Sequence, residues 1–341
     1  MYKLIFMVIA LACGSSLISK AQSTDSIKNH IDSALNILKT NSLYSKNVNW
    51  DNIYSRVNEA AKNSKTKADT FAALNIAFNA LEDKHAVFYH YDNQFRVDNK
   101  SLTDRYSDSL KTEWKKGPRI LAEMVGTSAY LRIPYIGSKS EKEIKAMGEL
   151  MQSKIEELVK NKPKNWIIDL RLNAGGNIRP MVAGLSPFFS DGILGYYVNR
   201  IGVVQEKLLI KQGHLIVGNE LPVILTNRHL ELSKAKVAVL IGPGTGSSGE
   251  ILASYFKQRK NTSLFGEKSA GLASVTEGFV FNNDNTYFLL TVARLSDKNG
   301  KVLPEIIEPD FEVKANDHFT SMSSDLVVQK AIGWLSRKKR Q

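Results

Sequence analysis

The chain has 341 residues, of which 43% are hydrophobic and 23% are charged, which excludes a disordered chain and indicates a globular protein. Its 22 glycines and 9 prolines exclude a collagen-like chain, and its single cysteine excludes a disulfide framework and a cysteine-based zinc site. The net charge of +12 is scattered and has no interleaved aromatic platform, so we expect no nucleic-acid partner.

The first residues have the pattern of an export signal. Lys3 precedes an apolar run from Leu4 to Cys13, which is too short to span a bilayer, and Ser19-Lys20-Ala21 is a small-x-small cleavage site. We therefore predict a signal peptide over residues 1–21 and an exported protein, either periplasmic or secreted. The alternative is a lipoprotein signal ending at Cys13, in which case a lipid on that residue would anchor the protein to a membrane.

The segment after the signal predicts three short helices. Apolar side chains recur at helical spacing over residues 26–38, 50–61 and 70–81, which is typical of a small helical bundle. Residues 87–118 are polar and poorly periodic, so we expect a connector there. We therefore predict an N-terminal helical domain and connector over residues 22–118.

From residue 119 to the end of the chain at residue 341, the pattern changes to strands that alternate with helices. The predicted strands are 129–133, 166–170, 237–241 and 263–265, and the predicted helices are 142–158 and 249–258. Residues 278–295 predict a β-hairpin that turns at 283–285. The alternation indicates a layered α/β core with a largely parallel sheet.

A glycine-rich turn follows the buried strand that ends near Leu170. Gly175 and Gly176 let the backbone approach a ligand closely and expose N–H groups. The turn could supply part of an oxyanion hole. It could equally be a tight connection between strand and helix, in which Asp169 pairs with Arg171.

A second glycine-rich turn, residues 244–250, lies between a buried strand and a predicted helix. Ser247 follows a glycine at the helix N-terminus, which is how many hydrolases present a nucleophile. The alternative is that Ser247 and Glu250 form a capping box and have no catalytic role.

The six histidines show no metal-binding spacing such as H-x-x-x-H, so we expect no metal and no other cofactor. His85 lies at the end of the third predicted helix and could be a general base or a structural residue. Glu305 could be a catalytic carboxylate or an exposed loop residue.

In chain order, these segments read D-x-H, D-L-R-x-N-x-G-G, G-S-S-G-E, G-E-x-x-A-G, T-V-A-x-x-x-D-x-x-G and I-x-P-D. The series covers about residues 70–313 and resembles the C-terminal processing (tail-specific) serine peptidases. That family includes the tricorn core protease and interphotoreceptor retinoid-binding protein. The resemblance implies a ClpP/crotonase-like core preceded by a small helical bundle, and a peptide or protein substrate.

The resemblance also implies roles for individual residues. Ser247 matches the nucleophile, and the oxyanion donors would be the N–H of Ser248 and that of Gly175 or its neighbour Gly176. The lysine base of the tail-specific branch is replaced here by Leu272, so the Ser/Lys dyad is absent.

In the tricorn-like branch, the base is a histidine that is oriented through a serine and a glutamate. His85 matches this histidine, Lys84 stands in place of the serine, and Glu305 is the nearest candidate for the glutamate. Lys268 is the competing base. The interval between residues 87 and 121 is too short for a PDZ domain, so the chain resembles the PDZ-less branch.

We therefore predict an exported serine-type peptidase that forms an acyl-enzyme on Ser247. His85 would be its general base, with a pKa near the ordinary histidine value of about 6.5. Two alternatives remain at this point: a non-catalytic relative that binds a peptide or a hydrophobic ligand, and an esterase. The sequence leaves the bond specificity and the oligomeric state open.

Overall fold

The fold is that of a computed structural model, which describes residues 23–220, 222–226, 230–281, 286–314 and 317–337. The signal peptide predicted over residues 1–21, its alternative at Cys13 and the hairpin turn predicted at 283–285 lie outside the described residues. No helix in these ranges is both long enough and apolar enough to cross a membrane.

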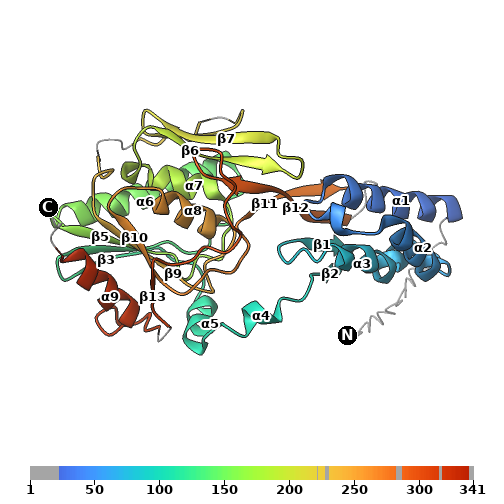
Figure 1. Ribbon diagram of the computed structural model, residues 1–341, viewed down its shortest axis with the longest axis horizontal. Coiled ribbons are helices and arrows are strands. Elements are labelled where there is room, and N and C mark those ends of the chain that lie inside the picture. The colour runs from blue at the N-terminus through green and yellow to red at the C-terminus, as the bar shows by residue number, and fades with distance from the viewer. Residues whose placement is uncertain (1–22, 221, 227–229, 282–285, 315–316, 338–341) are drawn as a thin grey trace, which may run out of the picture.

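The three predicted helices are present and form a bundle at one end of the molecule (Figure 1). They are α1 (Thr24–Asn41), α2 (Trp50–Ala61) and α3 (Phe71–Ala80), with the 3-10 turns η1 (Ser45–Asn47) and η2 (Ala68–Thr70) between them. The side chains of Ser23 and Asn49 cap α1 and α2. Each helix buries one apolar face against the others.

The expected connector contains four short elements. They are β1 (Val87–His90), β2 (Asn93–Phe95), α4 (Lys100–Thr103) and α5 (Asp108–Lys115). Elements of three to eight residues are too short to show a periodic pattern, which is why the sequence predicted none of them. In Figure 1, the chain runs from the bundle through α4 to α5, which lies below the core.

The predicted layered core is confirmed. Its six-stranded sheet has the order β13-β10-β9-β5-β4-β3, and only β3 runs antiparallel to its neighbour. The strands are β3 (Leu121–Val125), β4 (Ser128–Arg132), β5 (Asn165–Asp169), β9 (Val237–Ile241), β10 (Thr262–Gly266) and β13 (Phe311–Glu312).

Helices cover both faces of this sheet (Figure 1). On one face lie α6 (Glu141–Val159), α7 (Ile178–Gly184), the 3-10 turn η3 (Ser186–Phe188) and α8 (Ser248–Lys257), and on the other lies α9 (Leu326–Leu335). Side chains alternate between the two faces, so Ile168 and Val239 belong to the larger core, whereas Ile167 and Leu240 pack with α9.

A second sheet was not expected from the sequence. It has seven strands, in the order β2-β1-β12-β6-β7-β8, with β11 also paired to β12. The additional strands are β6 (Gly192–Asn199), β7 (Val204–Lys211), β8 (His214–Val217), β11 (Ser274–Val280) and β12 (Thr286–Ser296). The antiparallel pairing of β11 with β12 confirms the predicted hairpin.

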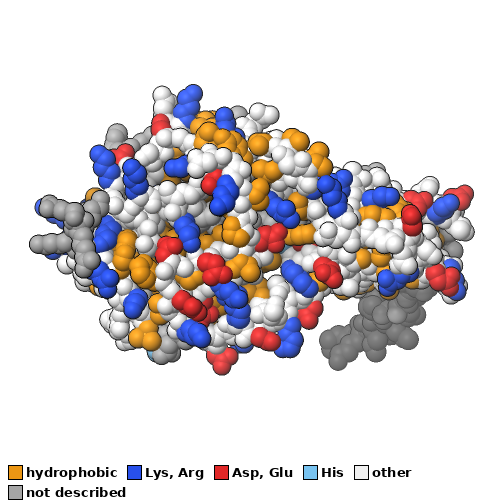
Figure 2. All heavy atoms as spheres, viewed as in Figure 1, with side chains coloured by type: hydrophobic (Ala, Val, Ile, Leu, Met, Phe, Trp, Pro, Cys, Tyr) orange, Lys and Arg blue, Asp and Glu red, His pale blue; other side chains and the backbone are white. Residues whose placement is uncertain are grey.

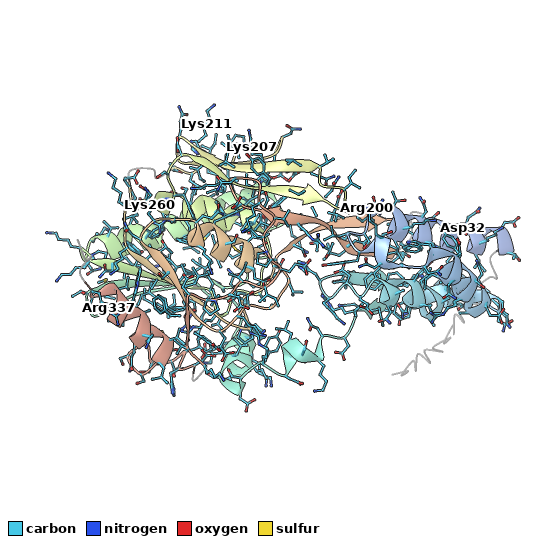
Figure 3. The ribbon with its side chains drawn as sticks, in the orientation of Figure 1. Asp32, Arg200, Lys207, Lys211, Lys260 and Arg337 are labelled. Carbon is cyan, nitrogen blue, oxygen red and sulfur yellow. The ribbon has the colours of Figure 1, made fainter. Side chains whose placement is uncertain are left out.

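The long strand β12 joins the helical end of the molecule to the core. Its first residues pair with β1, and its last residues pair with β6. The seven-stranded sheet therefore contains strands from both sides of residue 118. The β6–β7 hairpin makes a further bridge, because the Arg200 guanidinium donates to the Lys39 carbonyl at the end of α1, 2.9 Å away (Figure 3).

A buried ionic network fixes the end of β5. Arg171 donates to Asp169, and its Nη1 lies 2.9 Å from Asp317 Oδ1 and 2.7 Å from Asp325 Oδ2. The predicted pairing of Asp169 with Arg171 is therefore present. The bonds of Arg171 to Asp317 and Asp325 also join the C-terminal segment to the strand that leads into the glycine turn.

Over the face in Figure 2, basic and acidic side chains are interspersed.

Candidate active site

Ser247 occupies a strained turn between β9 and α8. Its backbone angles are φ 50° and ψ −120°, in a region that residues with a side chain rarely adopt. Such a turn points a side chain away from both the preceding strand and the following helix. This is the geometry by which hydrolases expose a nucleophilic serine.

The buried carboxylate of Glu250 holds this turn. One of its oxygens accepts the Ser247 N–H at 2.8 Å and the Leu272 N–H at 2.9 Å. The other accepts the Gly271 N–H at 2.7 Å and the Ser269 hydroxyl. Burial raises the pKa of Glu250 to about 7, against these four hydrogen bonds, which favour the charged form. Glu250 therefore caps the turn, as the capping-box alternative predicted, and also fixes loop 268–272.

The glycine turn lies directly against Ser247. A Cβ added to Gly175 would lie 2.7 Å from the Ser247 Cβ and 3.2 Å from its Oγ, so only glycine fits there. Two further bonds join the turns, because Gly246 N donates to the Asn173 carbonyl at 2.9 Å and Ser248 Oγ donates to the Gly176 carbonyl at 2.6 Å.

The N–H groups of the two turns differ in whether they already have a hydrogen-bond partner. The Gly175 N–H is already engaged, since it donates to the Asn173 side-chain oxygen at 2.9 Å. The N–H groups of Gly176 and Ser248 have no hydrogen-bond partner within the described part of the chain. A site for a developing oxyanion would therefore use these two amides more readily than that of Gly175.

His85 lies past the end of α3, in the turn before β1, where the buried carboxylate of Asp83 fixes the backbone. Asp83 Oδ1 accepts the N–H of His85 at 3.0 Å and that of Ala86 at 3.1 Å. The same carboxylate accepts the N–H of Thr291 at 3.0 Å and its hydroxyl at 2.9 Å. The first residue of the D-x-H motif therefore clamps the histidine turn onto β12.

The imidazole of His85 is positioned by a serine that the sequence analysis missed. Its Nδ1 lies 2.9 Å from Ser274 Oγ, at the start of β11. Burial, and secondarily the positive charge of Arg96, lower the pKa of His85 to about 4. Among the described residues, no hydrogen bond joins His85 to Ser247.

The backbone of Glu305 lies close to Ser274, whereas its carboxylate binds Tyr44. The Ala273 N–H donates to the Glu305 carbonyl at 3.1 Å, next to Ser274. The Glu305 carboxylate accepts the Tyr44 hydroxyl at 2.8 Å. Burial, together with Glu305, raises the pKa of Tyr44 above its ordinary value, so the hydroxyl keeps its proton and remains a donor.

The lysines near the motifs point elsewhere. The exposed Lys84 ammonium donates to the Asp98 carbonyl at 2.7 Å. Lys268 is exposed, and its carbonyl accepts from Arg105. In the described residues, no group of three or more histidine, cysteine or acidic side chains is placed to hold a metal ion.

Replacing Glu250 by glutamine should destabilise the fold. The amide group would face buried N–H donors and leave at least one of them unsatisfied, at a cost of about 1–3 kcal/mol in the free energy of unfolding. Urea denaturation would measure this loss. Glu312→Gln, on the exposed strand β13, is the matched control and should change stability by less than about 0.5 kcal/mol. Equal stability of both variants would contradict the clamping role.

The chain is similar to several known proteins. The model of peptidase family S41 matches residues 127–313, which is more than half of the chain. The nisin-resistance protein of Lactococcus lactis is 29% identical over 272 residues, which are 79% of this chain and 78% of that protein. The carboxy-terminal-processing protease of Bartonella bacilliformis is 28% identical over 193 residues, which are 55% of this chain but only 39% of that protein.

The fold also has close structural counterparts. A lipoprotein from Streptococcus agalactiae superimposes with a TM-score of 0.67 and 20% sequence identity, and the match covers 91% of this chain and 96% of that structure. The resemblance found in the sequence motifs is thus confirmed by the family match. The chain belongs to peptidase family S41 and is a serine-type peptidase whose substrates are peptides or proteins.

Proposed function

We propose that this protein is an exported peptidase that cleaves peptides through an acyl-enzyme on Ser247, with His85 as general base. The observation that carries the proposal is the contact between the strained Ser247 turn and the glycine turn, in which the place of a Gly175 Cβ lies 3.2 Å from Ser247 Oγ. At this contact, the Ser247 side chain lies beside the turns that carry the N–H groups of Gly176 and Ser248, which have no hydrogen-bond partner among the described residues. Export rests on the signal pattern of residues 1–21.

The first step is attack of Ser247 Oγ on the substrate carbonyl carbon. A serine hydroxyl is a poor nucleophile unless a base removes its proton. When Nδ1–H of His85 donates to Ser274 Oγ, the lone pair of Nε2 is left to accept that proton. Closure onto substrate would bring Nε2 within reach of Ser247, because catalytic hydrogen bonds are often longer without substrate.

The second step releases the amine. The imidazolium returns its proton to the leaving nitrogen, the C–N bond breaks, and an ester to Ser247 remains. Water, deprotonated by His85, then hydrolyses this ester and regenerates the serine. During both steps, the negative charge on the carbonyl oxygen would be stabilised by the N–H groups of Gly176 and Ser248.

Ser274 takes the orienting role that the residue before the histidine has in the tricorn-like branch. Lys84 cannot fill that role, since its ammonium donates to Asp98. Glu305 would then act further out, as a carboxylate that holds the loop bearing Ser274 through Ala273 and Tyr44. The proposed order of action is therefore Ser247, His85 and Ser274, with Glu305 in support.

The test is the loss of activity on single substitutions. Ser247→Ala should abolish both labelling by a fluorophosphonate and cleavage of a peptide that the wild type cleaves. His85→Ala should lower kcat by several orders of magnitude, roughly 10³-fold or more, whereas Lys268→Ala should remain near wild type. The readouts are labelling after denaturing electrophoresis and peptide turnover.

The opposite pattern would contradict the assignment. If His85→Ala kept full activity while Lys268→Ala lost it, a lysine would be the base. The peptidase and esterase hypotheses share the nucleophile Ser247, so labelling does not distinguish them. Turnover of esters but not of peptides would favour the esterase. Labelling that survives in Ser247→Ala would place the nucleophile elsewhere.

The pH dependence should reflect the low pKa of His85. Only neutral imidazole accepts a proton, so kcat/KM should rise with pH through about 4, rather than near 6.5 as the sequence alone suggested. Arg96→Ala removes a positive charge that disfavours imidazolium, so it should raise the pKa and move the rise to higher pH. Arg337→Ala, at the far end of the core in Figure 3, is the control and should leave the profile in place. An unchanged profile in Arg96→Ala would contradict this electrostatic coupling.

A further inference from the structure

A cavity of about 250 Å³ lies between α5 and the core, beside the glycine turn. Its apolar walls come from the connector and from two loops of the core, and include Trp114, Pro134, Tyr135 and Leu172. Nothing in the chemical steps above uses this cavity. Tyr135 is 48% exposed, which is high for an aromatic side chain that lines a cavity.

The cavity is attached to both turns of the active site. Ala174 lines it, and the next residue, Gly175, is the one that contacts Ser247. On the other side, Trp114 packs against the nucleophile turn, since a Cβ added to Gly244 would lie 3.0 Å from the Trp114 ring. The Trp114 indole N–H also donates to the Leu172 carbonyl at 3.3 Å. A substrate residue next to the scissile bond would thus have the cavity within reach.

The charged groups that line the cavity already have partners within the protein. The Glu113 carboxylate, only 5% exposed, binds Lys116 and lies 3.4 Å from the Arg119 guanidinium. The buried Arg132 guanidinium donates to the Tyr130 hydroxyl at 3.0 Å and to the Phe319 carbonyl at 3.2 Å. A charged side chain entering the cavity would have to displace one of these partners, whereas an apolar side chain would not.

We propose that this cavity is a specificity pocket, which receives an apolar side chain of the peptide adjacent to the scissile bond. The inference rests on the proposed function, because it assigns the pocket to the substrate of Ser247. It makes Trp114 and Tyr135 specificity-determining residues. It also gives the connector a role, since α5 supplies one wall of the pocket.

The test compares peptides that differ only at one position beside the cleaved bond, carrying leucine, phenylalanine, alanine or aspartate. At one such position the wild type should prefer leucine to alanine by about tenfold or more in kcat/KM, and should discriminate against aspartate more strongly. Tyr135→Ala opens the apolar wall and should reduce the leucine-to-alanine ratio severalfold. Trp114→Leu widens the pocket and should move the preference from leucine toward phenylalanine.

Ratios separate a pocket from a general defect, since damage to the fold would lower cleavage of all peptides in proportion. Tyr89→Ala, an exposed tyrosine on β1, is the matched control and should keep the wild-type ratios. Cleavage with ratios unchanged in both pocket variants would overturn the pocket's role alone. Absence of any Ser247-dependent cleavage would instead overturn the proposed function, and the pocket's role with it.

Discussion

One buried carboxylate determines the geometry on which the active site depends. Glu250 accepts hydrogen bonds from Ser247 and from three residues of loop 268–272, which lie on a different part of the chain. That loop leads directly to Ser274, and Ser274 contacts His85. The strained backbone of Ser247 and the orientation of His85 are therefore linked through the side chain of Glu250. Burial opposes the charge on Glu250, whereas its four hydrogen bonds favour that charge.

A second buried carboxylate, that of Asp83, holds the turn that carries His85. Asp83 binds the histidine turn on one side and Thr291 of β12 on the other. The Leu43 N–H also donates to the Thr291 carbonyl at 2.8 Å, so the bundle meets β12 at this residue from two directions. His85, the proposed base, belongs to the N-terminal segment, and Ser247, the proposed nucleophile, belongs to the core. Their relative position therefore depends on β12, the strand that spans both.

The parts of this site that the sequence predicted are those that follow from local pattern. Residues 166–170 and 237–241 are largely apolar runs followed within five residues by glycines, and such runs predict buried strands followed by tight turns. The pattern Ser247-x-x-Glu250 predicted a contact between these two residues, although it could not show that the same carboxylate also binds Gly271 and Leu272. Likewise, no pattern shows that Asn173 engages the Gly175 N–H.

The parts that were missed depend on contacts between distant segments. Ser274 is 189 residues from His85 along the chain, whereas the sequence motif places the orienting serine at position 84. Strand β1 is only four residues long and gains its order from pairing with β12. The strands β6, β7 and β8 form hairpins on a second sheet, and they do not follow the alternation of strands and helices that predicts the core. Tertiary pairing, rather than local propensity, decides such elements.

The central claim is that Ser247, Gly176 and Ser248 form a ready-made site for acyl transfer. The most direct measurement is a crystal structure of the protein after reaction with a fluorophosphonate, which leaves a tetrahedral phosphonyl group on Ser247. The account predicts one phosphonyl oxygen at about 3 Å from both the Gly176 nitrogen and the Ser248 nitrogen, with the Gly175 N–H still bound to Asn173. A phosphonyl oxygen that contacts neither of these nitrogens would contradict it.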